Sequence, residues 1–390
     1  KKIKILLNKP EMKKILENLF SLSSLQIANY IIPLITLPYL VRVLGPEKFG
    51  LTSFAQAFIL YFIFLVDFGF NFSATKEISI NRQDSCRVSE IFSSIFLIKF
   101  LIMLLSFLIF LIIISTVSIF RIEFSFYLLN FLTVVGWIIF PQWYFQGIEK
   151  MKFIALVNFL AKLIFTIAIF FFVKESRDYI RIPILNFIGL VFSGIVSLII
   201  IFYYYPVKLK FPKSQTISKQ FNLGLKIFIS NVGINLYTTS NSVMLGLLTN
   251  NVIVGYYTAA EKIFKAFQYL SIPINQSVFP HFSQLISINR ERAIQLFNKF
   301  FWISLLLTSL VSLLMVIFSP LVKIFLGKEF TPSVIIFLIL AIGLVPSLGN
   351  YTLGIQGLIN FGFEKTFAAV VFVVGVLHIS LLGLLIKYFG

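Results

Sequence analysis

Apolar runs of about 20 residues recur along almost the whole chain, and they limit what the chain can fold into. A helix needs about 20 mostly apolar residues to cross the hydrocarbon core of a bilayer. Eleven runs meet this requirement, at residues 18–43, 49–72, 91–119, 126–147, 153–173, 182–205, 223–249, 253–280, 299–319, 334–358 and 367–388. Because 58% of the residues are hydrophobic and only 12% are charged, the sequence predicts an all-α polytopic membrane protein.

Lysine and arginine residues indicate how the chain is oriented. The net charge of +18 is spread along the chain rather than gathered in one basic tract, so a nucleic-acid-binding face is not expected. With a cytoplasmic N-terminus, the cytoplasmic segments hold 19 of the 33 Lys and Arg residues and the opposite segments hold nine. This satisfies the positive-inside rule. Trp143 and Tyr144, at the end of one run, are expected to be interfacial anchors.

The N-terminus and the cysteine content exclude some processing events. The basic stretch KKIKILLNKPEMKKILENLF is not followed by a short apolar region with a small-residue cleavage site, so we expect a retained first span and no signal peptide. Cys86 is the only cysteine. An intrachain disulfide and a cysteine-based metal site are therefore not expected, and no cofactor is predicted.

An interrupted stretch between the first two runs has a counterpart later in the chain. In LPYLVRVLGPEKFG, a Gly-Pro pair should end one helix, and Gly50 opens a stripe of small residues that favours close helix packing. In LGLLTNNVIVGYYTAAEKIF, Gly255 aligns with Gly50. The pair Gln356-Gly357 aligns with Gln146-Gly147 at a similar offset. The sequence thus predicts an internal repeat.

The repeat predicts how the chain is divided. Six runs separate the two copies, so both halves should enter the membrane in the same direction, as in the parallel repeats of secondary transporters. We expect an N-lobe at residues 1–206, a charged cytoplasmic linker at 207–222 and a C-lobe at 223–390. Symmetry would require a twelfth span. The expectation is either a chain truncated after Gly390 or an eleven-span variant.

The motifs on both sides of these breaks resemble a known family. NYIIPLITLPYLVRVLGPEKFGLTSFAQAF, DFGFNFSATKEIS and PQWYFQGIEKMKF in the first half, with LYTTSNSVMLG, VGYYTAAEKIF and PINQSVFPHFS in the second, are similar to the polysaccharide transporter family, which includes the O-antigen and capsule repeat-unit flippases (Wzx type). The resemblance implies the fold of the multidrug/oligosaccharidyl-lipid/polysaccharide exporter superfamily, with two six-helix lobes in a V around a central cavity.

The resemblance also implies a cargo and a location. The cargo would be an oligosaccharide linked to undecaprenyl pyrophosphate, carried across the bacterial plasma (inner) membrane. Membrane lipid and the glycan polymerase machinery would be the partners. No motif in this sequence reports which sugar is carried.

Charged residues inside the apolar runs are candidates for the cargo site, because a charge at mid-bilayer costs about 2.5–3.5 kcal/mol on insertion scales. The cations are Arg42, Lys99, Lys162, Lys262 and Lys265. We expect them to face a water-filled cavity that receives the anionic pyrophosphate head. Lysine suits this as a mobile point charge, and arginine can hold phosphate oxygens bidentately.

Structural roles remain open for several of these cations. Lys99 can snorkel to the interface, and Arg42 can simply mark a helix end. Lys265 is four residues from Glu261, so the two can form a structural ion pair, which leaves Lys262 as the cation outside that pair. Lys162 has no charged neighbour within one helical turn.

Two further basic residues are weaker candidates. Lys226 lies one turn into its run and should snorkel, so it is excluded. His378 stands alone on an apolar run, where a packed, hydrogen-bonded histidine is the more common arrangement.

Polar and acidic residues provide two more sets of candidates. Gln26 and Asn29 in the first run, and Asn231, Asn235 and Thr238 in the seventh, can either line a sugar-facing surface or form interhelical hydrogen bonds. The carboxylates Asp67 and Glu261 are candidates for binding a coupling ion, H⁺ or Na⁺.

Two alternative functions belong to different classes. A cation-coupled multidrug exporter of the same superfamily would favour acidic intramembrane residues, whereas here lysines outnumber carboxylates. A membrane-embedded glycan polymerase would be an enzyme with a large external loop, but the predicted external segments are short and contain no nucleophile–base pair. The prediction is therefore a flippase that works by alternating access, and not an enzyme.

Overall fold

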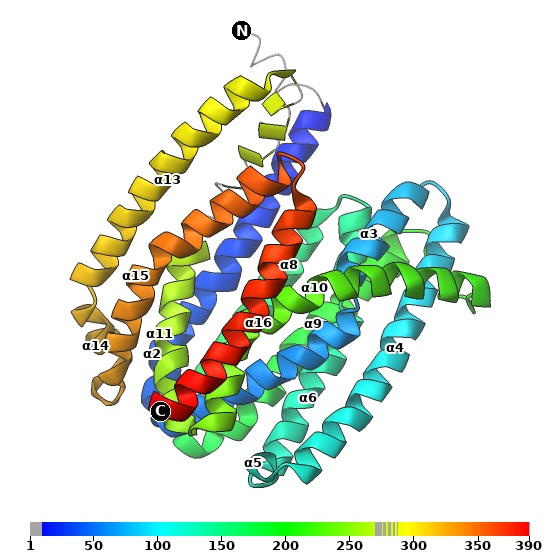
Figure 1. Cartoon of the computed structure of the whole chain (residues 1–390). Helices are drawn as coiled ribbons and strands as arrows, with labels where there is room; N and C mark the ends of the chain where they lie inside the picture. The colour runs from blue at the N-terminus through cyan, green and yellow to red at the C-terminus, as the bar shows by residue number, and fades with distance from the viewer. Residues whose placement is uncertain are drawn as a thin grey trace. The chain divides into compact units, whose positions relative to one another are not determined.

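The computed structural model describes residues 10–269, 275, 278–279, 282–283, 285–286 and 288–389, and it leaves the side chains of 10–31, 230–238 and 389 undescribed. All regular elements in this part of the chain are helices (Figure 1). The first half contains α2 (Pro10–Asp67), α3 (Phe70–Asn81), α4 (Ser85–Thr116), α5 (Ser118–Arg121), α6 (Phe124–Ile139), α7 (Gln142–Gly147), α8 (Met151–Phe172), η1 (Ser176–Ile180) and α9 (Arg181–Tyr204). The second half contains α10 (Ser214–Leu248), α11 (Asn251–Tyr269), α13 (Arg290–Ile317), α14 (Pro320–Leu326), η2 (Lys328–Phe330), α15 (Pro332–Thr352), η3 (Leu353–Ile359) and α16 (Glu364–Phe389).

Eight segments of the described chain are long and apolar enough to cross a membrane. These are Ile32–Asn81, Ser85–Thr116, Phe124–Gly147, Met151–Phe172, Ser176–Tyr204, Arg290–Ile317, Pro332–Ile359 and Glu364–Tyr388. The prediction of an all-helical, multi-span membrane protein is confirmed. The first of the eight segments covers parts of two predicted spans. Two further predicted spans, 223–249 and 253–280, fall largely on α10 and α11, which are helical but are not among the eight segments. The count of eleven stays a prediction.

The predicted break between the first two spans lies inside α2. Gly45 has a non-helical backbone, with φ at 69° and ψ at 174°. Its neighbour Pro46 has no N–H to donate, and Pro33 and Pro38 also lie within α2. A left-handed φ is accessible to glycine without a Cβ penalty, and proline removes one helical hydrogen bond. The Gly-Pro pair therefore ends one helix and begins the next without an intervening loop.

The two glycines that the repeat aligns lie against each other. A Cβ built on Gly50 would stand 1.7 Å from the carbonyl oxygen of Asn251 and 2.7 Å from the amide nitrogen of Gly255. A Cβ on Gly255 would stand 2.2 Å from the carbonyl oxygen of Pro46. Such distances are far below van der Waals contact, so this crossing of α2 and α11 requires glycine on both helices. The small-residue interpretation of Gly50 is confirmed.

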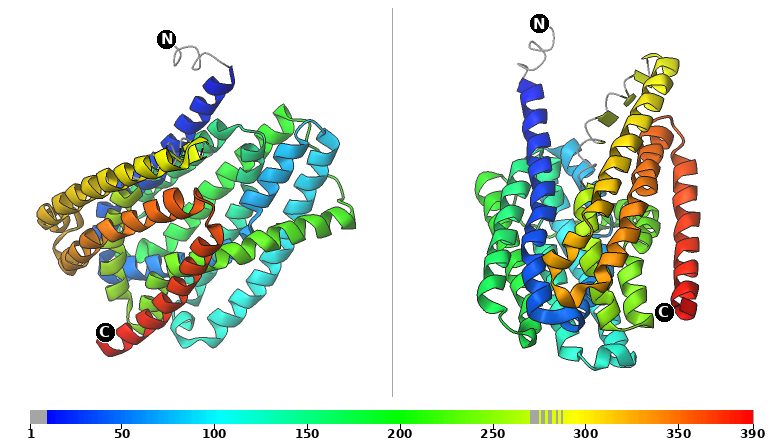
Figure 2. Two further views of the ribbon diagram at one scale, coloured as in Figure 1. Left: turned by 45° about the horizontal axis from the view of Figure 1, so that its top comes forward. Right: turned by 90° about the vertical axis from the view of Figure 1, so that its left-hand side faces the viewer.

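The described chain divides into two compact units. The first contains Ala55–Thr239 and the part of α2 up to Ile32, and the second contains Pro33–Phe54 and the chain from Ser240 onward. In the first unit α9 packs against both α6 and α8. In the second unit α15 packs against α13 and α11, and the views in Figures 1 and 2 agree that α13 and α15 run side by side. The lobe boundaries expected from the repeat stay a prediction.

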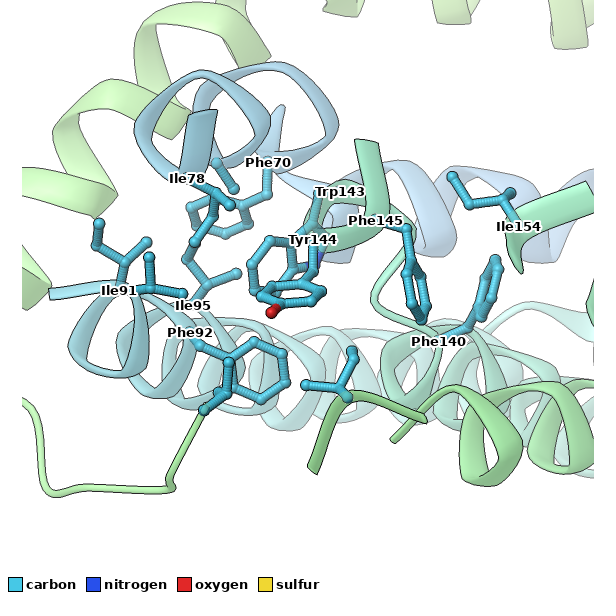
Figure 3. Close-up of a cluster of buried hydrophobic side chains, with 14 of the residues drawn as sticks. Phe70, Ile78, Ile91, Phe92, Ile95, Phe140, Trp143, Tyr144, Phe145 and Ile154 are labelled. Atoms are coloured by element: carbon cyan, nitrogen blue, oxygen red, sulfur yellow. The ribbon is translucent and has the colours of Figure 1, made fainter. Parts of the chain in front are cut away.

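A buried aromatic cluster forms the core of the first unit (Figure 3). Trp143 and Tyr144, on α7, pack against Phe92 of α4 with ring centroids 5.4 and 5.6 Å apart. Their side chains are only 1% and 2% exposed. Both residues lie at the end of the candidate span Phe124–Gly147, where α7 turns their side chains into the core. Their expected role as interfacial anchors stays a prediction. Gly147 ends α7 where a Cβ would stand 2.7 Å from Ile78.

The segment before α10 is fixed to the first unit. The backbone N–H groups of Lys208 and Lys210 donate to the hydroxyls of Ser89 and Ser93 on α4, each at 3.0 Å. One turn into α10, the Thr216 hydroxyl donates to Glu90 at 2.7 Å. Two alternate residues of this stretch are thus bonded to α4. The part of the predicted linker that precedes α10 therefore forms a strap along α4, whereas residues 214–222 belong to α10.

The glycine crossing predicts an unequal response to two glycine substitutions. Gly50→Ala must separate α2 from α11, and overpacking of this kind costs about 1–3 kcal/mol or more. Gly343→Ala on α15 is the matched control, because a Cβ there meets nothing within 4 Å and alanine favours a helix. The melting temperature of purified protein in detergent should fall for Gly50→Ala only. Equal melting temperatures for the two variants would contradict the close approach.

Candidate functional site

Asp67 and Lys99 form a buried ion pair in the first unit. Asp67 is the last residue of α2, and the chain turns after it because Phe68 and Gly69 have positive φ values of 47° and 75°. Lys99 comes from α4 and places its Nζ 3.1 Å from Asp67 Oδ1, with its side chain only 3% exposed. Asn71 donates to the other carboxylate oxygen at 2.7 Å. Lys99 is therefore paired inside the protein and does not snorkel.

Lys162 and Lys226 differ in exposure. Lys162 lies near the middle of α8, one of the candidate spans, and its side chain is half-buried. Lys226, more than three turns into α10, is exposed. Its snorkelling stays a prediction. Of these two cations, only Lys162 has the partial burial expected of a cation in a polar cavity within the membrane.

Three charged side chains lie within five residues of one another on α11. The Nζ of Lys265 is 3.0 Å from Glu261 Oε1, so the predicted i,i+4 pair is present. Lys262 forms no ion pair with the residues that the structure describes. Its Nζ instead lies 4.8 Å from the ring centroid of Phe49, within the range of a cation–π interaction. Lys262 thus lies on a different face of α11 from Glu261 and Lys265.

Glu261 ends a chain of hydrogen bonds that crosses three helices of the second unit. His378 Nε2 on α16 is 2.8 Å from Asn241 Oδ1 on α10. Asn241 donates from Nδ2 to the Tyr257 hydroxyl at 2.8 Å, and this hydroxyl donates to Glu261 Oε1 at 3.3 Å. His378 is therefore a packed, hydrogen-bonded residue, as expected. The sequence analysis missed Tyr257, although its i,i+4 spacing to Glu261 was a signal.

Arg42 contacts the end of a short helix in the second unit. Its Nη2 donates to the carbonyl oxygens of Ile324 and Phe325 at 2.8 and 3.1 Å. These are among the last carbonyls of α14, which lack partners within the helix. Arginine at this position satisfies them and complements the helix dipole. The geometry favours the structural role for Arg42, and its expected contact with phosphate stays a prediction.

The polar candidates in the first and seventh runs cannot be placed as a site. The side chains of Gln26, Asn29, Asn231, Asn235 and Thr238 lie outside the described residues. At the repeat-related turns, Gln146 accepts a hydrogen bond from Thr75 at 3.2 Å. Gln356 donates to the carbonyl oxygen of Asn275 at 2.7 Å. Both glutamines thus have structural partners.

The arrangement of these helices defines a class of protein. The fold matches a solved structure of a multidrug resistance MATE family transporter of the MOP superfamily, in an inward-facing conformation. The TM-score is 0.67 at 14% sequence identity, and the match covers 94% of this chain and 91% of that one. A likeness at this identity concerns the fold alone. The protein is therefore a multi-span membrane protein with a MATE-like fold.

Sequence comparison identifies the family. The model of the family described as "Polysaccharide biosynthesis protein" matches residues 15–286. The chain is 31% identical over 371 residues to an Escherichia coli (strain K12) protein named "Putative O-antigen transporter", covering 94% of this chain and 88% of the relative. A Shigella dysenteriae protein of the same name is 28% identical over 312 residues, covering 78% and 76%. The chain belongs to this polysaccharide biosynthesis family, whose members are transporters and not enzymes.

The Asp67–Lys99 pair predicts non-additive losses of stability. Asp67→Asn should lower the free energy of unfolding by about 3–5 kcal/mol, because it leaves a buried ammonium without its counter-ion. Combining it with Lys99→Met should recover much of that loss, because an apolar side chain then replaces the ammonium. The measurement is a double-mutant cycle on the unfolding of purified protein. Strictly additive losses would mean that the two groups do not interact.

Proposed function

We propose that this protein moves undecaprenyl-pyrophosphate-linked O-antigen or capsule repeat units from the cytoplasmic to the outer leaflet of the bacterial plasma membrane. The observation that carries the proposal is the similarity along 94% of the chain to a relative named as an O-antigen transporter. The protein would work by alternating access, with two six-helix lobes around a central cavity and a cytoplasmic N-terminus.

The charges of the described helices support an anionic head group as the cargo. Both Lys162 and Lys262 are half-buried cations, the first on the apolar helix α8 and the second beside Glu261 on α11. Their ammonium groups are costly to keep in the membrane, and a pyrophosphate could bind them as a counter-ion. The polyprenyl tail would remain in lipid. Lys265 and Lys99 pair with carboxylates, whereas the Lys262 ammonium lies against the Phe49 ring, so Lys262 is a stronger candidate for the head group than those two lysines. Lys162 is a candidate because it lies half-buried near the middle of a candidate span.

The membrane potential favours this direction of transport. Moving one negative charge outward is worth about 2.3 kcal/mol per 100 mV when the inside is negative. A doubly charged pyrophosphate would gain roughly 4–5 kcal/mol if the protein charges stayed in place. The empty protein would then need an opposing step to return its cations.

Glu261 is the stronger candidate for a coupling-ion site. Both carboxylates pair with a lysine, Asp67 with Lys99 and Glu261 with Lys265. Glu261 in addition lies next to Lys262 in sequence and ends the chain of hydrogen bonds from His378. Binding of H⁺ or Na⁺ at Glu261 would change the charge beside a cation of the proposed cargo site. The sugar-lining role of Gln26, Asn29, Asn231, Asn235 and Thr238 belongs to the same proposal.

A multidrug exporter is the second candidate function, because the fold neighbour is a multidrug resistance transporter. A cationic drug would require uncompensated carboxylates within the membrane. Both intramembrane carboxylates, Asp67 and Glu261, pair with lysines in the described structure. The charge balance thus favours an anionic cargo.

Loss of the two half-buried cations should abolish transport. Cells in which Lys162→Ala/Lys262→Ala replaces the native protein should accumulate lipid-linked repeat units facing the cytoplasm and lose surface polymer, while the variant still inserts into the membrane. Lys226→Ala is the matched control, since Lys226 is exposed, and it should transport normally. Full activity of the double variant would contradict a cationic cargo site.

The leaflet that the repeat units occupy separates the proposed function from its alternatives. In cells that lack the protein, units confined to the cytoplasmic leaflet are expected. Unpolymerised units in the outer leaflet would indicate a polymerase defect instead. Normal units with altered drug sensitivity would indicate a drug exporter.

Glu261→Gln should uncouple transport from an imposed ion gradient. The amide keeps the size and the hydrogen-bonding oxygen of the carboxylate but has no negative charge with which to bind H⁺ or Na⁺. Uptake of a lipid-linked repeat unit into inside-out vesicles should then respond neither to a pH gradient nor to a Na⁺ gradient. An undiminished response to both gradients would exclude Glu261 as the coupling site.

A further inference from the structure

The segment Pro33–Phe54 of α2 is held by the second unit, although the parts of α2 on both sides of it belong to the first. We call it the anchored segment. Its apolar side chains Leu37, Val41 and Leu44 are at most 3% exposed. The packing that buries these side chains therefore belongs to the second unit, and it would be lost if the segment left that unit.

Polar and backbone contacts fix the anchored segment at several points. Arg42 donates to the last carbonyls of α14, and Gly50 lies against Gly255 at the closest backbone approach with α11. Phe49, beside Gly50, has its ring edge-on to Phe330, with centroids 5.8 Å apart and planes at 82°. The segment is thus attached by its backbone, by a guanidinium and by an aromatic side chain.

Phe49 also holds the candidate cargo cation. The Nζ of Lys262 lies 4.8 Å from its ring centroid, and the Phe49 side chain is only 2% exposed. The ring face carries negative electrostatic potential and attracts the ammonium. Glu261 is bonded by Lys265 and Tyr257, so the ring of Phe49 is the group that the described structure places against the Lys262 ammonium.

An anion that binds Lys262 competes with this ring. A pyrophosphate attracts the ammonium more strongly than a ring quadrupole does, because it carries full negative charges and accepts hydrogen bonds. Drawing the ammonium to the anion removes one of the interactions that hold Phe49 in place. Since Phe49 precedes Gly50 directly, the loss acts next to the closest contact between the anchored segment and α11.

We propose that Phe49 is a positioning residue that holds the Lys262 ammonium ready for the cargo, and that binding of a pyrophosphate head group to Lys262 releases the anchored segment from the second unit. This proposal rests on the proposed function for its ligand. It links arrival of the cargo to a conformational change through one side chain.

Release of the anchored segment can be measured by the reactivity of a buried thiol. In a Cys86→Ser background, Val41→Cys places a single cysteine at a position that is 0% exposed. Leu37→Cys, at 1% exposed, is a second reporter in case the first does not fold. The full chain in nanodiscs is treated with N-ethylmaleimide with and without undecaprenyl pyrophosphate. Undecaprenol, which has the tail but no charge, is the control ligand.

Undecaprenyl pyrophosphate should accelerate alkylation at least threefold, and undecaprenol should not. Phe49→Leu should raise the rate without ligand by a similar factor and abolish the response to ligand. Phe49→Tyr keeps the ring face and should behave as the native residue does. If Phe49 acted only by filling apolar space, leucine and tyrosine would both replace it, and the two variants would not differ in this way.

Two results would overturn the proposal in different ways. If Phe49→Leu neither raises the basal rate nor removes the ligand response, Phe49 does not hold the segment, and the proposed cargo is untouched. If Phe49→Leu raises the basal rate but the native residue shows no response to undecaprenyl pyrophosphate, the release step is wrong. The leaflet that the repeat units occupy in cells lacking the protein then decides separately whether the proposed cargo is wrong as well.

Discussion

Backbone hydrogen bonding in lipid is the constraint on which the rest of this structure depends. With no water to satisfy N–H and C=O groups, a chain this apolar must close its hydrogen bonds within helices. Breaks in the helices then favour residues that tolerate a left-handed backbone, although Phe68 and Glu149 also have positive φ values. Four glycines have positive φ values: Gly45, Gly69, Gly327 and Gly362. Gly45 interrupts α2, Gly69 directly precedes α3, and Gly327 lies between α14 and η2. The break at Gly45–Pro46 is compact enough to pack directly against α11.

The same lack of solvent governs the side-chain charges. Lys99 and Lys265 pair with carboxylates, and the Arg42 guanidinium donates hydrogen bonds to helix carbonyls. Lys262 instead faces an aromatic ring. An ion pair satisfies its charge fully, whereas a ring quadrupole does so weakly and exchanges readily for an anion. The different partners therefore separate Lys99, Lys265 and Arg42 from Lys262, the cation that the proposed cargo site uses.

The sequence predicted features that depend on position along the chain. Run lengths located the long helices, the Gly-Pro pair located the break in α2, and the internal repeat picked out Gly50 and Gly255 before their contact was known. The sequence could not predict which way a helix is rotated. The burial of Trp143 in the core and the Phe49 partner of Lys262, some two hundred residues away, were therefore missed. Such pairings depend on tertiary packing, which leaves no local periodicity.

The strap along α4 restricts the segment that connects the first half of the chain to the second. Since it is bonded to Ser89 and Ser93, it has little freedom to act as a flexible joint. The boundary between the two units falls further on, between Thr239 and Ser240, within the continuous helix α10. A helix resists twisting as well as bending, whereas a loose loop resists neither. The chain therefore passes from one unit to the other at this point through a helix, which transmits a twist that a loose loop would absorb.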